Sequence, residues 1–158
     1  MKKEKYYEII NDKAFDILNN EKFNSQKKFM QHGKTSTYDH IFNVAIMSLQ
    51  ISNKFNIKCD EKSLIRGALL HDYCLYDWHE NDKSHRLHGF RHAKKALINA
   101  RNDYDLNSIE ENIIYTHMFP LNLRLPKYKE SIIICLADKV CALLEMFKWS
   151  NYERKEKI

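Results

Sequence analysis

The chain has 158 residues, and its 26 Lys and Arg against 21 Asp and Glu give a formal net charge of +5. A chain of this length can bury a real hydrophobic core without disulfides or other staples, so one domain is the natural expectation. With only 3 Gly and 2 Pro, the composition excludes a glycine-rich phosphate loop and argues against an all-β fold, which needs frequent turn residues. The modest charge, with acidic and basic residues interspersed, gives no strong nucleic-acid signature.

Neither the first residues nor the cysteines indicate export or a membrane. The segment MKKEKYYEII is charged and lacks the apolar region of a signal peptide. The longest apolar run, near 132–136, is far too short for a membrane span. The four cysteines, Cys59, Cys74, Cys135 and Cys141, share no CxxC or zinc-ribbon spacing. We therefore expect a cytoplasmic protein with reduced thiols and no membrane partner.

Apolar side chains recur at three- and four-residue steps along most of the chain, a spacing typical of amphipathic helices. The predicted helices cover 2–19, 22–30, 36–55, 61–72, 89–102, 108–117 and 129–149. Ser36 or Thr35, and then Asp60, are the expected N-caps of two of these helices. Asn107 with Glu110 predicts a capping-box start for another. The helix over 129–149 is the most apolar, and we expect it at the centre of the fold.

Two segments lack a helical period. Residues 73–87 are polar and irregular, and we interpret them as an ordered functional loop because long structureless segments are uncommon in compact domains. Residues 118–128 form a second loop, punctuated by Pro120 and Pro126. The charged tail 151–158 is expected to fray. With no internal repeat or linker evident, the sequence predicts an all-α, single-domain helical bundle.

The unusual number in the composition is 8 His. Imidazole and carboxylate side chains gather at the ends of apolar helices or inside them, and the candidate metal ligands are His40, His71, Asp72, His88, His117 and Asp138. Such mixed donors suit Fe, Mn, Zn, Ni or Co better than Ca, which prefers oxygen alone. Asp138 lies within ICLADKVCALL, where an ionised carboxylate is costly unless it is paired or metal-bound.

Each candidate also has a structural interpretation. His71 ends a helix, where the helix dipole favours an imidazole, and Asp138 could pair with a Lys or a backbone N–H. His40 could be an exposed polar residue of a first helical turn. His88 and His117 could orient other ligands or bind phosphate. No single spacing is diagnostic, so the signal lies in the order and placement of the whole set.

This order resembles the HD-domain metal-dependent phosphohydrolases, whose pattern is a His, a His-Asp doublet, often two more His, and a distal Asp. The resemblance covers about 36–145 and includes GALLHD and HGFRHA, while HDYCLYDWHE and THMFPLNLRLPKYKES resemble a bacterial branch of the superfamily. Two departures are visible: the doublet is not followed by Ile-Gly, and Met118 rather than a second His follows His117. The resemblance implies one HD domain over 1–158, with helices of 1–30 packed on the motif core.

The resemblance implies a metal centre between helices that serves phosphate-ester hydrolysis. His40, His71, Asp72 and Asp138 would hold one ion, and Asp72 would bridge to a second ion held by His88 and His117. His71 and Asp72 are then the expected catalytic residues. The implied cofactor is one or two divalent ions, of Fe, Mn, Zn, Ni, Co or Mg, that activate a hydroxide.

The implied partner is a small phosphorylated substrate, a phosphomonoester or phosphodiester such as a nucleotide. A metal-containing sensor domain that binds a nucleotide without turnover is the alternative, as is a helical interaction module with structural histidines. The sequence leaves the oligomeric state open.

A phosphate group needs positive counter-charge, which Arg can supply in a bidentate fork and Lys as a point charge. The expected substrate-binding residues are Arg91, Arg124, His92 and Lys139. For each of them a solvated side chain is the plainer interpretation. His79 and His85 in the loop after the doublet could also contact substrate, whereas His32 is expected to be incidental.

Overall fold

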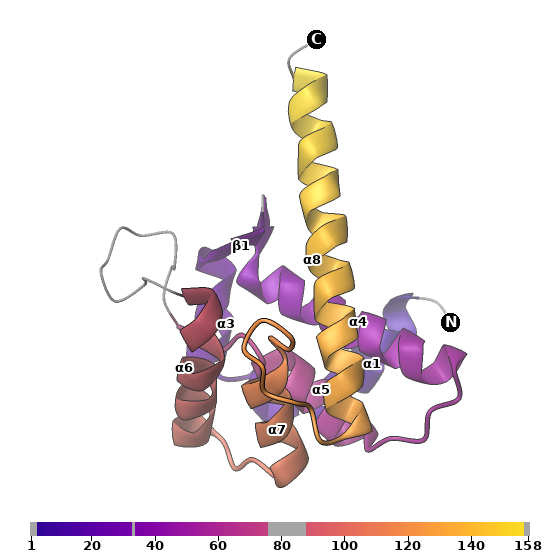
Figure 1. Cartoon of the computed structure of the whole chain (residues 1–158), viewed down its shortest axis with the longest axis vertical. Helices are drawn as coiled ribbons and strands as arrows, with labels where there is room; N and C mark the ends of the chain where they lie inside the picture. The colour runs from indigo at the N-terminus through magenta and orange to yellow at the C-terminus, as the bar shows by residue number, and fades with distance from the viewer. Residues whose placement is uncertain (1–2, 33, 76–87, 157–158) are drawn as a thin grey trace.

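The computed structural model describes residues 3–32, 34–75 and 88–156, and the side chains of residues 3, 32, 88–91 and 148–156 are outside the description. The elements in chain order are α1 (Lys3–Lys13), α2 (Phe15–Leu18), α3 (Glu21–Ser25), the 3-10 helix η1 (Gln26–Lys28), β1 (Met30–His32), β2 (Thr35–Ser36), α4 (Thr37–Lys54), α5 (Glu61–Leu70), α6 (His88–Asp103), α7 (Ser108–Thr116) and α8 (Lys129–Glu156). Helices build the fold, and the described strands form one small antiparallel pair (Figure 1). The predicted all-α class is confirmed.

The predicted N-caps begin the helices that lead to the candidate ligands. The Ser36 hydroxyl accepts a hydrogen bond from the Asp39 N–H at 3.1 Å and starts α4. The Asp60 carboxylate accepts one from the Ser63 N–H at 2.7 Å and starts α5. At the start of α7, Asn107 and its N3 glutamate make the reciprocal bonds of a capping box. These caps satisfy backbone donors that would otherwise lack partners, and so fix where each helix begins.

The N-terminal region differs from the prediction of two continuous helices. Ala14, with φ −135° and ψ 32°, separates α1 from α2, and its side chain is fully buried. The second predicted helix is α3 followed by η1, after which the chain becomes extended. The Thr37 N–H donates to the Phe29 carbonyl at 2.8 Å, which ties this extended segment to the start of α4. A tertiary contact therefore overrides the local helical pattern here.

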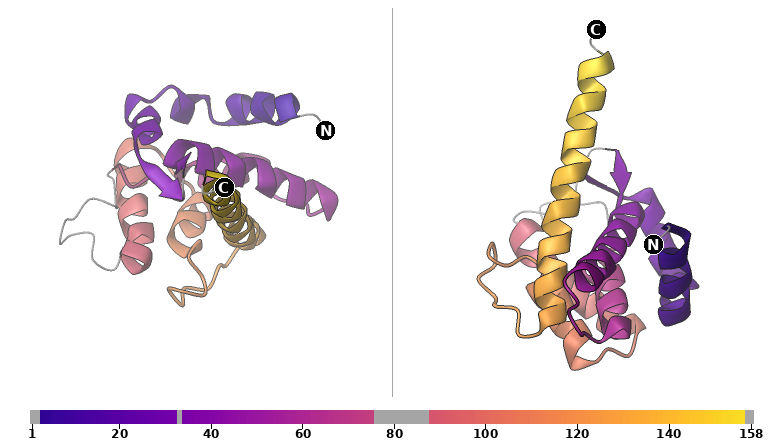
Figure 2. Two further views of the ribbon diagram at one scale, coloured as in Figure 1. Left: turned by 90° about the horizontal axis from the view of Figure 1, so that it is seen from above. Right: turned by 90° about the vertical axis from the view of Figure 1, so that its right-hand side faces the viewer.

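The central helix is α5, not α8 as we expected. Every residue of α5 from Ser63 to Leu70 is buried, and the helix packs against α1, α4, α7 and α8. Helix α8 instead lies at the side of the bundle, against α4 and α7, and its C-terminal half extends beyond the other described helices (Figures 1 and 2). It ends at Glu156, past the predicted end near 149, in a segment without Gly or Pro.

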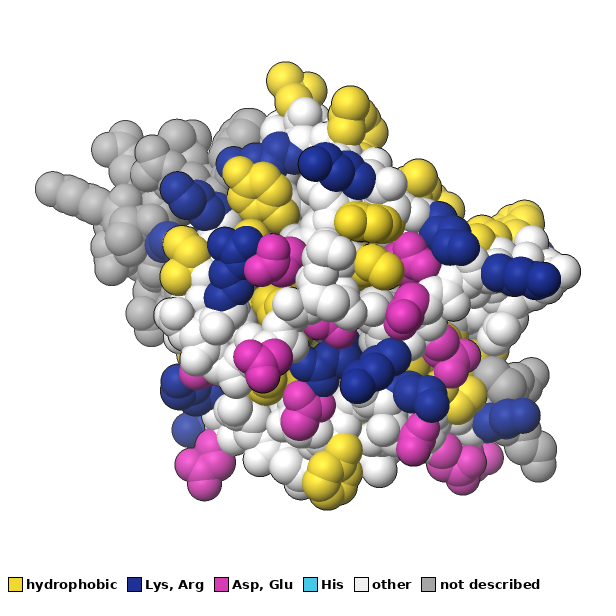
Figure 3. Space-filling model, turned by 90° about the horizontal axis from the view of Figure 1, so that it is seen from below, with side chains coloured by type: hydrophobic (Ala, Val, Ile, Leu, Met, Phe, Trp, Pro, Cys, Tyr) yellow, Lys and Arg dark blue, Asp and Glu magenta, His cyan; other side chains and the backbone are white. Residues whose placement is uncertain are grey.

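The surface mixes charge and apolar groups. On the face seen from below, Lys and Arg side chains alternate with Asp and Glu, and hydrophobic side chains gather along one edge (Figure 3). Within the described part of the chain, no helix is both long enough and apolar enough to cross a bilayer.

Gly67 of α5 provides a test of the central packing. A Cβ at this position would lie 2.5 Å from Cδ1 and 2.9 Å from Cγ2 of Ile113 in α7. Alanine normally favours a helix by up to about 1 kcal/mol over glycine, but overpacking a tight core costs about 1–3 kcal/mol. We expect Gly67→Ala to lower the free energy of unfolding by about 1 kcal/mol, as measured by urea denaturation.

The matched control is a double-mutant cycle with Ile113→Ala, which removes both crowded methyl groups. The cost of Gly67→Ala should disappear in that background, because only the helix propensity then remains. An equal cost in both backgrounds would mean that the α5–α7 contact is not the cause.

Candidate metal centre

Six ionisable side chains from five parts of the chain meet in one buried cluster. The members are His40 in the first turns of α4, His71 and Asp72 at the end of α5, His92 in α6, His117 at the end of α7, and Asp138 in α8. All six are buried, with 8% exposure or less. Residues far apart in the sequence are thus brought together where the start of α4 and the ends of α5 and α7 meet α6 and α8.

The first group of side chains lies around one oxygen of Asp72. His71 Nε2 is 3.4 Å and His40 Nε2 is 4.0 Å from Asp72 Oδ2. Asp138 Oδ1 lies 3.1 Å from His40 Nε2 and 3.7 Å from His71 Nε2. Two imidazole nitrogens and two carboxylates therefore converge on one small region.

The second group lies around the other oxygen of Asp72. His92 Nε2 is 3.2 Å and His117 Nε2 is 3.4 Å from Asp72 Oδ1. The two ring nitrogens are only 2.7 Å apart. The ligand atoms of His40, His71 and Asp72 lie within 4.8 Å of one another, as do those of Asp72, His92 and His117, so each of these triplets is a candidate for holding an ion. Asp72 belongs to both groups, the position that a bridging carboxylate would occupy.

Backbone carbonyls set the orientation of two imidazoles. His71 Nδ1 lies 2.7 Å from the Ala68 carbonyl, and His117 Nδ1 lies 2.8 Å from the Ile114 carbonyl, three residues back in each case. Because a carbonyl only accepts, each Nδ1 must carry a proton, and Nε2 is the atom that faces the cluster and offers a lone pair when the ring is neutral. This is the arrangement that metal-binding histidines typically show.

Charge complementarity shifts the pKa values of the first group. Burial lowers the pKa of His40, but hydrogen bonds to Asp138 and Glu145 outweigh it and raise the pKa to about 10. Burial raises the pKa of Asp138, yet the hydrogen bonds and charges of His40 and His71 hold it below its usual value. In the metal-free protein, His40 is therefore an imidazolium between carboxylates.

In the second group the pKa of His117 is lowered, whereas the pKa of His40 in the first group is raised. Burial is the main reason that the pKa of His117 is lowered, although Asp72 opposes it. Burial also raises the pKa of Asp72, but the surrounding histidines, His71 first among them, hold it well below its usual range. Asp72 is thus ionised, next to a His117 ring that stays neutral and can offer a lone pair.

Two contributors to the cluster were missed by the sequence analysis. Glu145, two turns after Asp138 in α8, accepts a hydrogen bond from His40 Nδ1 at 2.8 Å and another from the Asn43 amide at 3.0 Å. Gln31 of β1 donates to Asp72 Oδ2 at 2.6 Å. The seven-residue spacing from Asp138 places Glu145 on the same face of the helix, and it was the one available sequence signal.

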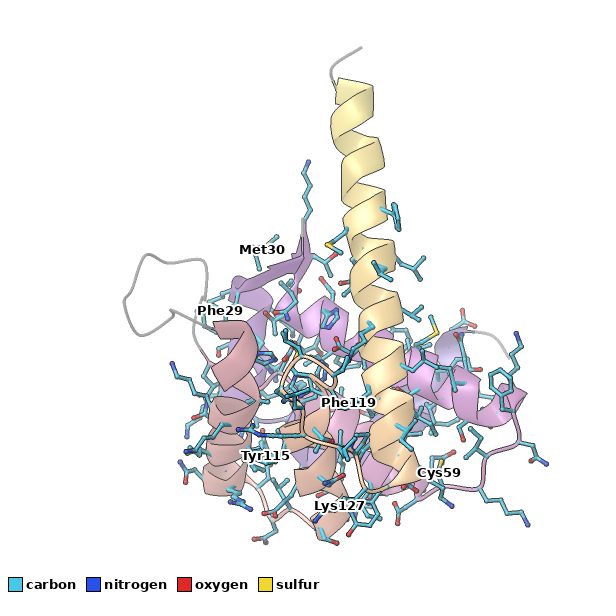
Figure 4. The ribbon with its side chains drawn as sticks, in the orientation of Figure 1. Phe29, Met30, Cys59, Tyr115, Phe119 and Lys127 are labelled. Carbon is cyan, nitrogen blue, oxygen red and sulfur yellow. The ribbon has the colours of Figure 1, made fainter. Side chains whose placement is uncertain are left out.

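The remaining sequence-predicted site residues divide into two sets. The side chains of His79, His85, His88 and Arg91 lie outside the described residues. Lys139 Nζ donates to the carbonyls of His117 and Cys135 at 3.0 and 3.1 Å. Arg124 stacks over the ring of Tyr115, 3.9 Å from its centroid, and the labelled Tyr115 lies between α6 and α7 (Figure 4).

His92, predicted as a substrate contact, lies inside the cluster. Its place four residues after His88 puts both on one face of α6, so the sequence alone did not distinguish them.

The donor set fits a divalent transition metal. His71 Nε2 and Asp72 Oδ1 are buried without a hydrogen-bond partner among the described residues, although burying a bare polar atom normally costs about 1–3 kcal/mol. Unpartnered imidazole and carboxylate atoms that face one small buried region are typical of a cation site. Imidazole and carboxylate donors together favour Fe, Mn, Zn, Ni or Co.

An all-α fold with adjoining His/Asp groups between helix ends defines a helical domain that could hold divalent metal. The family model described as HD domain matches residues 37–143, so the chain belongs to the HD-domain family. The matched segment contains all six residues of the cluster and Gln31 lies just before it. Comparison of the chain with curated proteins and with solved structures gives no significant match.

Removing metal should destabilise the protein. A bound ion that is absent from the unfolded chain adds to stability, and it also neutralises Asp72 and Asp138. We expect EDTA to lower the melting temperature measured by differential scanning fluorimetry, and back-titration with Mn or Fe to restore it. No stoichiometric metal by mass spectrometry, together with an unchanged melting temperature, would mean that the histidines are structural.

Glu145 should tune metal affinity without touching the ion. Its carboxylate holds the Nδ1 proton of His40, and partners of this kind are typically worth about 10- to 100-fold in metal affinity. We expect Glu145→Gln to weaken metal binding in a chelator-competition assay, and Glu145→Ala to weaken it further.

Glu111→Gln is the matched control, because Glu111 accepts from Arg101 in a surface ion pair. Its metal affinity should equal that of the wild type. Unchanged affinity in both Glu145 variants would exclude a role for Glu145 in orienting His40.

Proposed function

We propose that this protein is a metal-dependent phosphohydrolase that cleaves a small phosphate ester, such as a nucleotide. The observation that carries the proposal is the pair of ligand groups on the two oxygens of Asp72. A bridging ligand must offer two donor atoms, which a carboxylate can do and an imidazole cannot. Membership of the HD-domain family supports the same reaction class.

Divalent ions bound here would supply Lewis-acid stabilisation of phosphoryl charge and a lowered pKa for water. The chain itself would supply the orientation. Carbonyls of α5 and α7 hold a proton on Nδ1 of His71 and His117 and so leave Nε2 as the ligand atom, and Gln31 fixes one oxygen of Asp72. Geometry held by hydrogen bonds of this kind need not reorganise during the reaction.

Two further features are part of the proposal. None of the four cysteines forms a disulfide, which supports a cytoplasmic location with reduced thiols. We also propose, from the sequence pattern, that His88 holds a metal ion and that Arg91 contacts the substrate; both belong to the first turn of α6.

Replacing Asp72 is the direct test of the proposed reaction. We expect wild-type protein to release phosphate or an alcohol from at least one member of a phosphate-ester panel when loaded with Mn, Fe, Mg, Ni or Co. Asp72→Ala removes both bridging oxygens and should reduce the rate by at least about 1,000-fold, since removing one key electrostatic group already costs about 100- to 1,000-fold. Released phosphate and nucleoside products are measured by colorimetry and chromatography.

Glu111→Gln again serves as the control and should retain full activity. Asp72→Ala activity equal to that of the wild type would contradict the proposal. A wild-type protein that holds metal and binds nucleotides, but hydrolyses no ester with any of these ions, would instead be a sensor.

A further inference from the structure

The outer face of α8 is apolar over four turns. Six large hydrophobic side chains are exposed there, with exposed fractions from 46% to 65%: Ile132, Leu136, Leu143, Leu144, Met146 and Phe147. The opposite face of the same helix carries Asp138 and Glu145 into the buried cluster. A helix that is apolar all round is normally covered on all sides. The outer face of α8 therefore lacks the cover that its composition calls for.

The outer face carries little charge. Between residues 131 and 147 the only ionisable acidic or basic side chains are Asp138, Lys139 and Glu145. Asp138 and Glu145 contact His40, and Lys139 bonds to two backbone carbonyls. For a charged ligand, a nucleic acid or a phosphate the face thus offers only the half-buried Lys139, whose ammonium is already bonded to those carbonyls. An apolar protein surface is the partner that it fits.

The spacing along the face is symmetric, which points to a second copy of this chain. Ile132, Leu136, Leu143 and Phe147 are separated by four, seven and four residues. If two such helices pack antiparallel about a two-fold axis between residues 139 and 140, Leu136 meets Leu143 of the second copy. The outer residues of the series, Ile132 and Phe147, then also meet. A two-fold interface needs this self-complementary spacing.

The arrangement of the bundle permits that pairing. The body of each copy lies on the inner side of its own α8, so the two bodies fall on opposite sides of the helix pair. About this axis, residues 143–156 of one α8 would lie along residues 136 to 123 of the other copy, which are the first turns of its α8 and the end of the preceding loop. Unsupported helical turns depend on tertiary packing, which the second copy would provide.

The buried area is sufficient for a stable dimer. Six side chains that are each about half exposed offer on the order of 600 Å² of accessible surface. Two copies would bury roughly 1,200 Å², at the lower limit of specific interfaces. The exposed Leu121, Leu123 and Leu125 of the preceding loop are not needed to reach this figure.

We propose that two copies of the chain form an antiparallel dimer through the outer face of α8. The proposal does not rest on the catalytic function, because the face lies opposite the ligand cluster. It makes α8 the one helix that both supplies ligands to the candidate metal centre and joins the two copies.

Sedimentation velocity of the full chain over a range of concentrations tests the dimer. The wild-type chain, of 19.0 kDa, should sediment as a dimer of about twice that mass at micromolar concentration. Leu136→Glu combined with Leu143→Glu places like charges opposite each other and should weaken the dimer by at least about 100-fold. Metal content and circular dichroism should stay at wild-type values.

Ile98→Glu is the matched control, because Ile98 is 47% exposed on α6, away from this face. It should remain dimeric. A wild-type chain that is monomeric at every concentration would overturn the proposal, as would a dimer that survives the double substitution with its fold intact.

Cysteine cross-linking tests the antiparallel register and does not depend on the fold of the double variant. In a Cys59→Ser background, Ile132→Cys and Phe147→Cys chains should form a disulfide when mixed and mildly oxidised, and much less when each is alone. Cross-linking of each variant with itself alone would indicate parallel pairing and overturn the register. No cross-linked product in any mixture would overturn the interface.

Discussion

The two buried carboxylates of Asp72 and Asp138 are the constraint on which the rest of the structure depends. Each ionised carboxylate loses several kcal/mol of hydration in an interior unless it is compensated. The compensation here comes from imidazoles at four helices, so Asp138 determines how α4 must approach α8, and Asp72 determines how α6 and α7 must approach the end of α5. In the metal-free protein part of that charge is the imidazolium of His40. A divalent ion would supply the same charge from a single point.

The backbone carbonyls at the ends of α5 and α7, next to the ligand cluster, also need hydrogen-bond partners. The last carbonyls of a helix lack intrahelical donors, and a buried helix end must find partners for them. His71 and His117 donate Nδ1–H to carbonyls at the ends of α5 and α7, and Lys139 donates to the final carbonyl after α7. The same bonds that complete the helices therefore fix the ring orientation and leave each Nε2 facing the cluster.

The sequence predicts features that depend on residues close together along the chain. Caps at Ser36, Asp60 and Asn107 mark helix starts through their own hydrogen bonds, and they were predictable. The central position of α5 was not predictable from the sequence. A helix as apolar as α8 can be buried within its own chain, or it can contact a second chain. The interaction of Glu145 with His40 spans 105 positions, and no local pattern encodes it. The choice between His88 and His92 likewise depends on how far α6 is rotated, which only packing decides.

Helix α8 takes part both in the ligand cluster and in the proposed contact with a second copy. Asp138 and Glu145 are two turns apart on its inner face, and together they hold both nitrogens of His40. Position along the helix is therefore critical: a shift of one residue would rotate both carboxylates by about 100° away from the ring. Packing against α4 and α7 holds the first of these turns, but Glu145 lies in the part flanked by exposed Leu144 and Met146. A second copy packed on the outer face would cover that turn from the other side, while the bonds of Asp138 and Glu145 to His40 already fix its inner side.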